Sequence, residues 1–218
     1  MTDALCAITE QIPHNSDVRV ILLQGAGDHF MVGSDLKSFQ VMRNLTSDHA
    51  RFVKNIKELV QQAQKPIRLL RDLRQPVLAS VHGSVSGYGF SLMNACDMVI
   101  AADNTVFTSA YSQIGASPDG GSSWTLPRIV SYRRAFELMI LGDRLDVTTA
   151  LQFGLINKVV GTSRLKEETI ALADRLVNAP ALAIGNTKQL LSRAPLKPST
   201  TARRRKREFC SVRNTPGL

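Results

Sequence analysis

Short apolar runs alternate with longer segments of helical periodicity along most of the chain. Three runs are typical of strands: residues 17–24, which end at Gly25; 77–82, which follow Pro76; and 98–101. Each contains β-branched residues and ends close to a glycine or an asparagine, as strands between turns commonly do. We therefore expect three strands here, the first of them buried.

The longest helical pattern lies between the first two apolar runs. Its apolar positions recur every three or four residues, as in a helix with one buried face: Phe52, Ile56, Leu59, Val60, Ala63, Ile67, Leu70 and Leu73. Ser47 and Asp48 are candidate N-caps. Pro66 lacks the backbone N–H that a helix interior needs, so it predicts a break or a kink.

Three more helices are expected further along the chain. Residues 133–141 are closed by Gly142, residues 148–153 follow a possible cap at Asp146, and residues 165–177 are amphipathic. Strands that alternate with helices in this way predict an α/β fold.

The positive charge is concentrated at the C-terminal end. The whole chain has a formal net charge of +9, but residues 193–218 hold eight Lys and Arg against one acid, so residues 1–192 are nearly neutral. Apolar periodicity is lost from residue 195 onward, which predicts a domain over 1–192 and a disordered basic tail over 193–218. Residues 203–207 could contact phosphates, but nucleic acid is not the favoured partner because aromatic residues are not interleaved there.

Several classes of protein are excluded by composition. No apolar stretch approaches the roughly 18–20 residues of a membrane span, and the N-terminus lacks the pattern of a secretory signal. Three cysteines, Cys6, Cys96 and Cys210, lie far apart without the spacing of metal ligands. These features predict reduced thiols, a cytoplasmic location and no metal site.

Glycine-rich turns are the first candidates for chemistry. Residues 25–30 follow a strand, but Phe30 stands where a dinucleotide-binding fingerprint needs its third glycine. Two further turns, 32–37 and 82–92, contain glycines next to segments that we expect to be helical. Such turns can aim two backbone N–H groups at one oxygen and form an oxyanion hole; the alternative is that the glycines only make tight turns.

Four segments in unbroken order resemble the signatures of one family. Residues 18–37, 76–103, 114–142 and 150–159 are similar to the crotonase (enoyl-CoA hydratase/isomerase) superfamily. The resemblance covers roughly 17–192. It implies a spiral of ββα units, an acyl-CoA thioester as substrate, no cofactor beyond the CoA that the substrate carries, and a homo-oligomer, either a trimer or a hexamer.

The resemblance also implies an oxyanion hole. Carried over position by position, its donors are the backbone N–H groups of Ser34 and Tyr88. Tyr88 stands where many relatives have glycine, so its side chain must point away from the thioester. Lys37 becomes a candidate for a CoA phosphate, with an ordinary solvated lysine as the alternative. The glycines of both turns join the substrate-binding set: Gly33, Gly87 and Gly89.

The acid/base set indicates which reaction of the family to expect. Family hydratases use two glutamates, and these positions hold Ser91 and Tyr111 here, with no glutamate between Glu58 and Glu137. Two-glutamate hydration is therefore not expected, and we place Ser91 and Tyr111 in the substrate site. Asp119, in a Pro-Asp-Gly-Gly sequence, resembles the catalytic aspartate of single-aspartate enoyl-CoA isomerases; alternatively it only shapes a turn.

The remaining candidates have less support. Phe107 and Trp124 are expected in the core or lining the acyl pocket, and His29 and His82 are expected to be structural, because neither has a spaced acidic or serine partner.

The family pattern is not followed at either end of the chain. Residues 1–15 lack the usual opening segment, and a Pro-, Ser-, Thr- and Arg-rich sequence follows residue 192. We interpret this as a truncated, spliced or frameshifted form, in which the acyl pocket and the trimer are altered. The leading hypothesis is an isomerase; hydratase-like or dehalogenase-like enzymes and a non-catalytic CoA-ester-binding paralogue are the alternatives.

Overall fold

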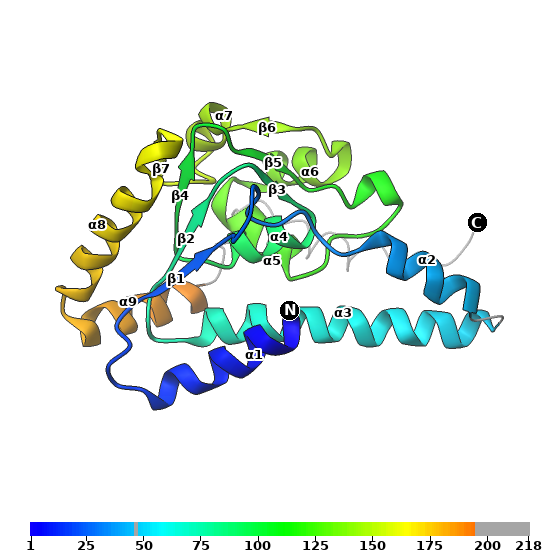
Figure 1. The fold of residues 1–218 in the computed structure, drawn as a ribbon, viewed down its shortest axis with the longest axis horizontal. Coiled ribbons are helices and arrows are strands. Elements are labelled where there is room, and N and C mark those ends of the chain that lie inside the picture. The colour runs from blue at the N-terminus through cyan, green and yellow to red at the C-terminus, as the bar shows by residue number, and fades with distance from the viewer. Residues whose placement is uncertain (46–47, 195–218) are drawn as a thin grey trace, which may run out of the picture.

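The computed structural model describes residues 1–45 and 48–194, and Figure 1 shows how their elements are arranged around two sheets. The larger sheet has four parallel strands in the order β1-β2-β4-β7. In the smaller sheet, of order β3-β5-β6, the first pair is parallel and the second antiparallel. The strands are β1 (Ile21–Gln24), β2 (Val77–Val81), β3 (Ser84–Ser86), β4 (Met98–Ala102), β5 (Val106–Thr108), β6 (Leu145–Asp146) and β7 (Lys158–Val160).

Successive passes of the chain place one strand in each sheet before a helix follows. β2 leads through β3 into α4 (Tyr88–Asn94), and β4 leads through β5 towards α5 (Ser122–Ile129). This repetition is the spiral of ββα units that the resemblance implies. The predicted α/β fold class is confirmed.

The core lies on both faces of the larger sheet. Every residue of β2 is buried, as is usual where helices or a second sheet cover both sides of parallel strands. Leu78 and Ile100 pack towards α8 (Leu165–Val177), whereas Ala79 and Val99 pack towards Phe107 of the smaller sheet. Because successive side chains of a strand point to opposite faces, the larger sheet has one apolar layer on each side.

The first predicted strand is shorter and less buried than expected. β1 covers Ile21–Gln24 instead of 17–24, and its residues alternate between half-buried and exposed. β1 is the edge strand of its sheet, so Ile21 and Leu23 pack against the core while Leu22 remains 38% exposed.

Helix α3 (His49–Asp72) runs along one side of the molecule with α1 (Thr2–Gln11) packed beside it (Figure 1). Asp48 caps it and accepts a hydrogen bond from Ala50 N (2.9 Å), as predicted, whereas Ser47 lies outside the described residues. The helix continues through Pro66, so the predicted break is wrong. Pro66 and the next turn are buried in the apolar cluster that α3 shares with α4, and this packing outweighs one lost hydrogen bond.

The later helices begin and end close to the predicted residues. Gly142 closes its helix in the left-handed conformation (φ +67°), and Asp146 caps the next one through Thr149 N (2.8 Å). The expected segment 165–177 coincides with α8. The other helices are η1 (Ile12–His14), α2 (Leu36–Leu45), η2 (Ser112–Ile114), α6 (Tyr132–Leu141), α7 (Val147–Gln152), η3 (Thr162–Arg164) and α9 (Ala181–Arg193).

Helix α9 ends at Arg193, the first residue of the tail predicted over 193–218, so the tail begins later than predicted. Residues 195–218 of the predicted disordered tail lie outside the described residues. Among the helices of 1–45 and 48–194, none is long and apolar enough to cross a membrane.

Gly89 fixes the distance between α4 and the segment before α2. A Cβ placed on Gly89 would lie 2.2 Å from the carbonyl oxygen of Met31, a backbone atom that cannot move aside alone. We expect Gly89→Ala to lower the free energy of unfolding by about 1–3 kcal/mol, as overpacking does. Gly27→Ala is the matched control, since nothing lies within 4 Å of its added Cβ; equal urea midpoints for the two variants would contradict this close packing.

Candidate active site

Two glycine turns from distant parts of the sequence touch each other. A Cβ on Gly33 would lie 3.7 Å from Tyr88 N, and a Cβ on Gly87 would lie 3.6 Å from the Cα of Gly33. Backbone hydrogen bonds hold the turns together: Ser86 N donates to Met31 O (2.8 Å) and Met31 N to Ser84 O (3.3 Å). Both glycines have positive φ, +97° and +53°, a conformation that favours glycine.

The amides that follow these glycines are free. Within the described residues, neither Ser34 N nor Tyr88 N donates a hydrogen bond. Tyr88 is the first residue of α4, where N–H groups have no partner within the helix. The two amides predicted as donors therefore lie at the contact between the two turns, and their role as oxyanion donors stays a prediction.

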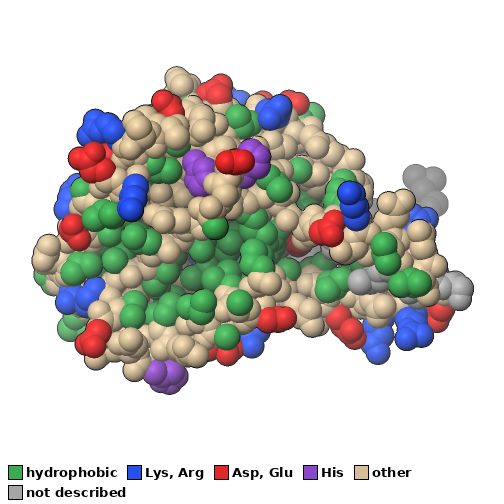
Figure 2. Space-filling view, in the orientation of Figure 1, with side chains coloured by type: hydrophobic (Ala, Val, Ile, Leu, Met, Phe, Trp, Pro, Cys, Tyr) green, Lys and Arg blue, Asp and Glu red, His purple; other side chains and the backbone are tan. Residues whose placement is uncertain are grey.

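Both amides border a cavity of about 670 Å³, a volume typical of small-molecule sites. An apolar face of α3 forms one wall, and the segment from Ala110 to Asp119 forms the opposite one. Figure 2 shows hydrophobic side chains gathered in a band between the α1 and α3 side of the molecule and the sheets. The lining residues are Val32, Gly33, Ser34, Leu36, Phe52, Ile56, Val60, Gly87, Tyr88, Ala110, Tyr111, Gln113, Ile114, Ala116, Ser117 and Asp119.

Asp119 is the single carboxylate among the described residues that line this cavity. Its side chain is half-buried, and the hydroxyl of Tyr111 donates a hydrogen bond to Oδ1. Burial raises the pKa of Asp119 above its ordinary value, while the hydrogen bond from Tyr111 opposes that rise. A carboxyl with a raised pKa is suited to take up and return a proton near neutral pH.

A buried network behind Tyr111 fixes this carboxyl. Ser91 Oγ lies 2.8 Å from the Tyr111 hydroxyl and 2.6 Å from Ser122 Oγ, and it donates to the backbone oxygen of Asp119 (3.1 Å). Ser91 is fully buried and does not line the cavity. The structure therefore places Ser91, expected in the substrate site, behind Tyr111 in a positioning network.

The side chain of Tyr88 is directed towards α3. Its hydroxyl donates to the backbone oxygen of Ala63 (2.7 Å), so the ring leaves the turn while the amide stays beside Gly33. Burial raises the pKa of Tyr88 above its ordinary value, and the nearby Asp119 adds to the rise. The phenol is therefore neutral and acts as a tether between α4 and α3.

Two expected substrate contacts do not line the cavity. Gly89 packs on the backbone of Met31, and Lys37 is exposed at the start of α2. The backbone amide of Lys37 donates a hydrogen bond to Asp35 Oδ1 (2.9 Å). Ser38 Oγ donates a second one to the other carboxylate oxygen, Asp35 Oδ2 (2.8 Å). Asp35 thus caps the beginning of α2, and these hydrogen bonds lower its pKa.

The weaker candidates divide between core and surface. Phe107 is fully buried, as expected, whereas Trp124 is 40% exposed and lines neither the core nor this cavity, so that expectation is wrong. Both histidines have structural partners: His29 Nδ1 accepts from Ser84 N (3.2 Å), and His82 Nε2 lies 2.6 Å from Gly27 O. In the described part of the chain, no three His, Cys, Asp or Glu residues are grouped to hold a metal.

Sequence analysis did not predict that an apolar face of α3 forms one wall of the cavity. Phe52, Ile56 and Val60 recur at a spacing of four residues, so a helix face was predicted, but which cavity that face borders depends on where α3 packs.

The structure therefore defines an α/β protein in which two backbone amides without hydrogen-bond partners among the described residues lie at the contact between two glycine turns. A family model described as Enoyl-CoA hydratase/isomerase matches residues 1–213. The chain belongs to the enoyl-CoA hydratase/isomerase family, also called the crotonase superfamily.

Curated relatives include both isomerases and hydratases. A peroxisomal Delta(3,5)-Delta(2,4)-dienoyl-CoA isomerase of Arabidopsis thaliana is 32% identical over 84% of this chain and 67% of its own length. The 1,2-epoxyphenylacetyl-CoA isomerase of Escherichia coli is 33% identical over 87% of this chain and 71% of its own length. A crotonyl-CoA hydratase of Syntrophomonas wolfei is 32% identical over 84% of this chain and 68% of its own length.

Solved structures agree with the fold. An enoyl-CoA hydratase from Polaromonas sp. JS666 superposes with a TM-score of 0.81 at 29% identity, over 97% of this chain and 80% of that one.

The burial of Asp119 predicts a measurable effect on stability. Because its pKa is raised in the fold, Asp119 contributes stability at low pH that is lost as pH rises through the raised pKa. Asp119→Asn keeps an acceptor for Tyr111 without the charge, so its Tm at neutral pH should exceed that of the wild type, by about 2–4 °C for each kcal/mol relieved. The difference should shrink as the pH falls. The exposed Asp143→Asn is the control, and a Tm for Asp119→Asn below the wild type would contradict the assigned electrostatics.

Proposed function

We propose that the protein is an enoyl-CoA isomerase, which shifts a carbon–carbon double bond in an acyl-CoA thioester with one aspartate as base and acid. The observation that carries the proposal is a single carboxylate, Asp119, facing the same cavity as two free backbone amides. The two relatives named above as isomerases support it.

The amides supply the electrophilic half of the reaction. The thioester oxygen would accept hydrogen bonds from Ser34 N and Tyr88 N, which converge because Gly33 and Gly87 touch. Negative charge grows on this oxygen when a proton leaves the neighbouring α-carbon. Fixed donors stabilise that charge without reorganising during the reaction.

Asp119 supplies the proton transfer. As a carboxylate it takes a proton from the α-carbon of a 3-enoyl thioester, and the electron pair delocalises through the double bond to the thioester oxygen as a dienolate. The protonated Asp119 then returns the proton to the γ-carbon, and the double bond comes to lie between the α- and β-carbons. No water is consumed, and the carboxylate is restored.

Tyr111 and Tyr88 prepare the site without exchanging protons. Tyr111 holds Asp119 Oδ1 by a hydrogen bond, and burial raises its own pKa so that it remains a donor. Tyr88 ties α4 to α3 through Ala63, which keeps its amide at the cavity while the ring stays aside.

A hydratase mechanism with two carboxylates has less support. The positions of the family's two glutamates hold Ser91 and Tyr111, which hydrogen bond to each other at 2.8 Å. Neither can act as a second carboxylate base for water. The relatives named as hydratases keep this reaction as the alternative that the kinetic test must address.

Replacing the base should separate chemistry from binding. Asp119→Asn should lower isomerisation of a 3-enoyl-CoA by about 10²–10⁴, the usual contribution of a general base, while the Kd for an acyl-CoA measured by calorimetry changes little. Wild-type hydration of a 2-enoyl-CoA should be slow. Robust hydratase activity that survives in Asp119→Asn would overturn the isomerase assignment.

The oxyanion hole can be tested through the backbone. Ser34→Ala keeps the N–H and should stay within a few-fold of wild-type activity. Ser34→Pro removes the donor and should lower kcat by about 10²–10³. Unfolding temperatures serve as the folding control; a folded Ser34→Pro variant with wild-type kcat would exclude Ser34 N as a donor.

A further inference from the structure

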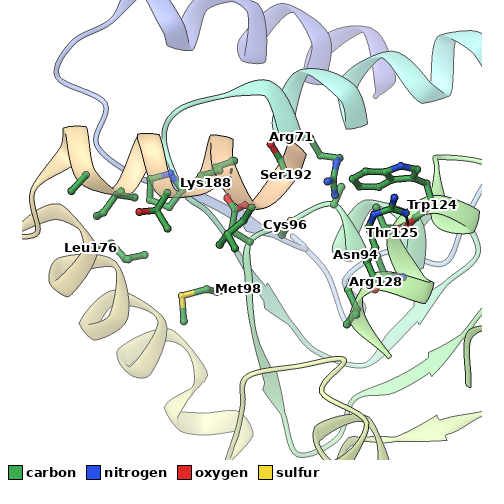
Figure 3. A pocket seen from close by; sticks show the side chains of 18 residues that line it. Arg71, Asn94, Cys96, Met98, Trp124, Thr125, Arg128, Leu176, Lys188 and Ser192 are labelled. Atoms are coloured by element: carbon green, nitrogen blue, oxygen red, sulfur yellow. Dashed lines mark hydrogen bonds and ion pairs between the residues drawn. The ribbon is translucent and has the colours of Figure 1, made fainter. Parts of the chain in front are cut away.

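A second cavity, of about 530 Å³, shares no lining residue with the candidate active site. It is open to the surface and bordered by the C-terminal part of α3, by α4 and α5, and by α8 and α9 (Figure 3). The residues around it divide into a polar end and an apolar end.

An unpartnered amide marks the polar end. Asn94 is 3% exposed, and within the described residues both its Nδ2 and its Oδ1 lack a hydrogen-bond partner. Buried polar atoms are paired in most proteins, because an unpaired one costs free energy comparable to a lost hydrogen bond. Asn94 lines the cavity, but its two amide atoms have almost no accessible surface, so the amide lies behind the cavity wall and out of reach of a ligand in the cavity.

Two guanidinium groups stand beside this amide. Arg71 Cζ lies 4.3 Å and Arg128 Cζ lies 3.7 Å from the centre of the Trp124 ring. Figure 3 shows these three side chains grouped with Asn94 at one end of the cavity.

Arg71 makes no direct ion pair. Arg128 donates to the backbone oxygen of Trp124 (2.7 Å), whereas Arg71 makes no hydrogen bond or ion pair with any described residue. Burial and the nearby Arg128 lower the pKa of Arg71 from its ordinary value, and the charges of Asp97 and Asp72 only partly oppose this. An anion bound beside the two guanidinium groups would favour their charged forms.

Lys188, the third cation at the cavity, is already satisfied. Its Nζ lies 2.7 Å from Asp97 Oδ2 and donates to the backbone oxygens of Leu70 and Gln75. The two arginines are therefore the groups left for a ligand.

The opposite end of the cavity is apolar. Met98 and Leu176 lie there, away from the arginines, in Figure 3. Ile129 and Ile184 add half-buried aliphatic surface to the lining. A ligand that filled the whole cavity would need one anionic end and one hydrocarbon end.

We propose that this cavity binds a monocarboxylate with an apolar body, such as a medium-chain fatty acid, with its carboxylate on the guanidinium groups of Arg71 and Arg128. Guanidinium groups match the planar carboxylate with two parallel hydrogen bonds. The aliphatic body would lie along Met98 and Leu176. The cavity volume suits a molecule of this size.

Trp124 makes the proposal directly measurable. It is the single tryptophan of the chain, so tryptophan fluorescence reports on this cavity and not on the candidate active site. Octanoate should change the emission in a saturable way and give a Kd that rises with ionic strength. 1-Octanol, which has the same chain without the charge, should bind at least about tenfold more weakly.

Three variants test the contacts. Arg71→Met should weaken octanoate binding about tenfold or more, and Arg133→Met, an exposed arginine on α6 that does not line the cavity, is the matched control. Asn94→Leu should leave octanoate binding unchanged, because the amide lies behind the cavity wall. It should fold at least as stably as the wild type, because it removes two unpaired polar atoms from a buried position.

Three results would overturn the proposal. The first is equal affinity for octanoate and 1-octanol, or an unchanged Kd in Arg71→Met. The second is the absence of both a fluorescence change and calorimetric heat at millimolar octanoate. The third is displacement of octanoate by octanoyl-CoA with unit stoichiometry, which would place the fatty acid in the candidate active site instead.

Discussion

The approach of one glycine turn to another is the constraint on which the site depends. Gly89 packs against the carbonyl of Met31, and Gly33 packs against Gly87. A side chain at Gly89 would clash with the Met31 carbonyl, and Gly33 and Gly87 have positive φ values that favour glycine. The contact that brings the amides of Ser34 and Tyr88 to one place therefore depends on these three glycines. The bridge between Met31 and Val85 extends the smaller sheet by one more strand-like segment, and this holds the first turn in place.

The same packing explains why the site can hold a carboxyl group with a raised pKa. Asp119 begins a tight turn in which Gly120 has a positive φ (+58°) and approaches Ile67 and Ser91 closely. The turn carries the carboxyl to the cavity wall, where burial disfavours its charge. The hydrogen bond from Tyr111 limits this rise, so burial and hydrogen bonding shift the pKa of Asp119 in opposite directions.

Local sequence signals predicted where helices begin and end, but they did not predict how those helices pack against the rest of the structure. Asp48, Asp146 and Gly142 act at short range and were found at helix ends, as expected. Pro66 was misjudged because its local preference competes with the burial of α3 against α4, which no local pattern reports. α1 and α2 lay outside the predicted elements.

The candidate site was predictable only in part for the same reason. The glycine turns and Asp119 could be placed through the ordered motifs of the family. The contact of Ser91 with Tyr111, Ser122 and the Asp119 backbone joins three separate segments, so it depends on tertiary packing. Trp124 shows the reverse case: a large aromatic residue suggests a position in the core or the acyl pocket, yet here it is 40% exposed and stacks with two arginines at the edge of other cavities.

The turn at Asp119 also separates two environments. Asp119 faces the candidate active site, whereas Gly120 and Gly121 line a cavity of about 450 Å³ that includes Arg71 and Trp124. Those two residues belong to the proposed carboxylate site as well. A single backbone turn therefore has the Asp119 carboxyl on one side and the cavities that contain Arg71 and Trp124 on the other. A Cβ placed on Gly120 would lie 2.7 Å from both Ile67 Cδ1 and Ser91 Cβ, so the turn packs tightly against α3 and α4 where it separates the two environments.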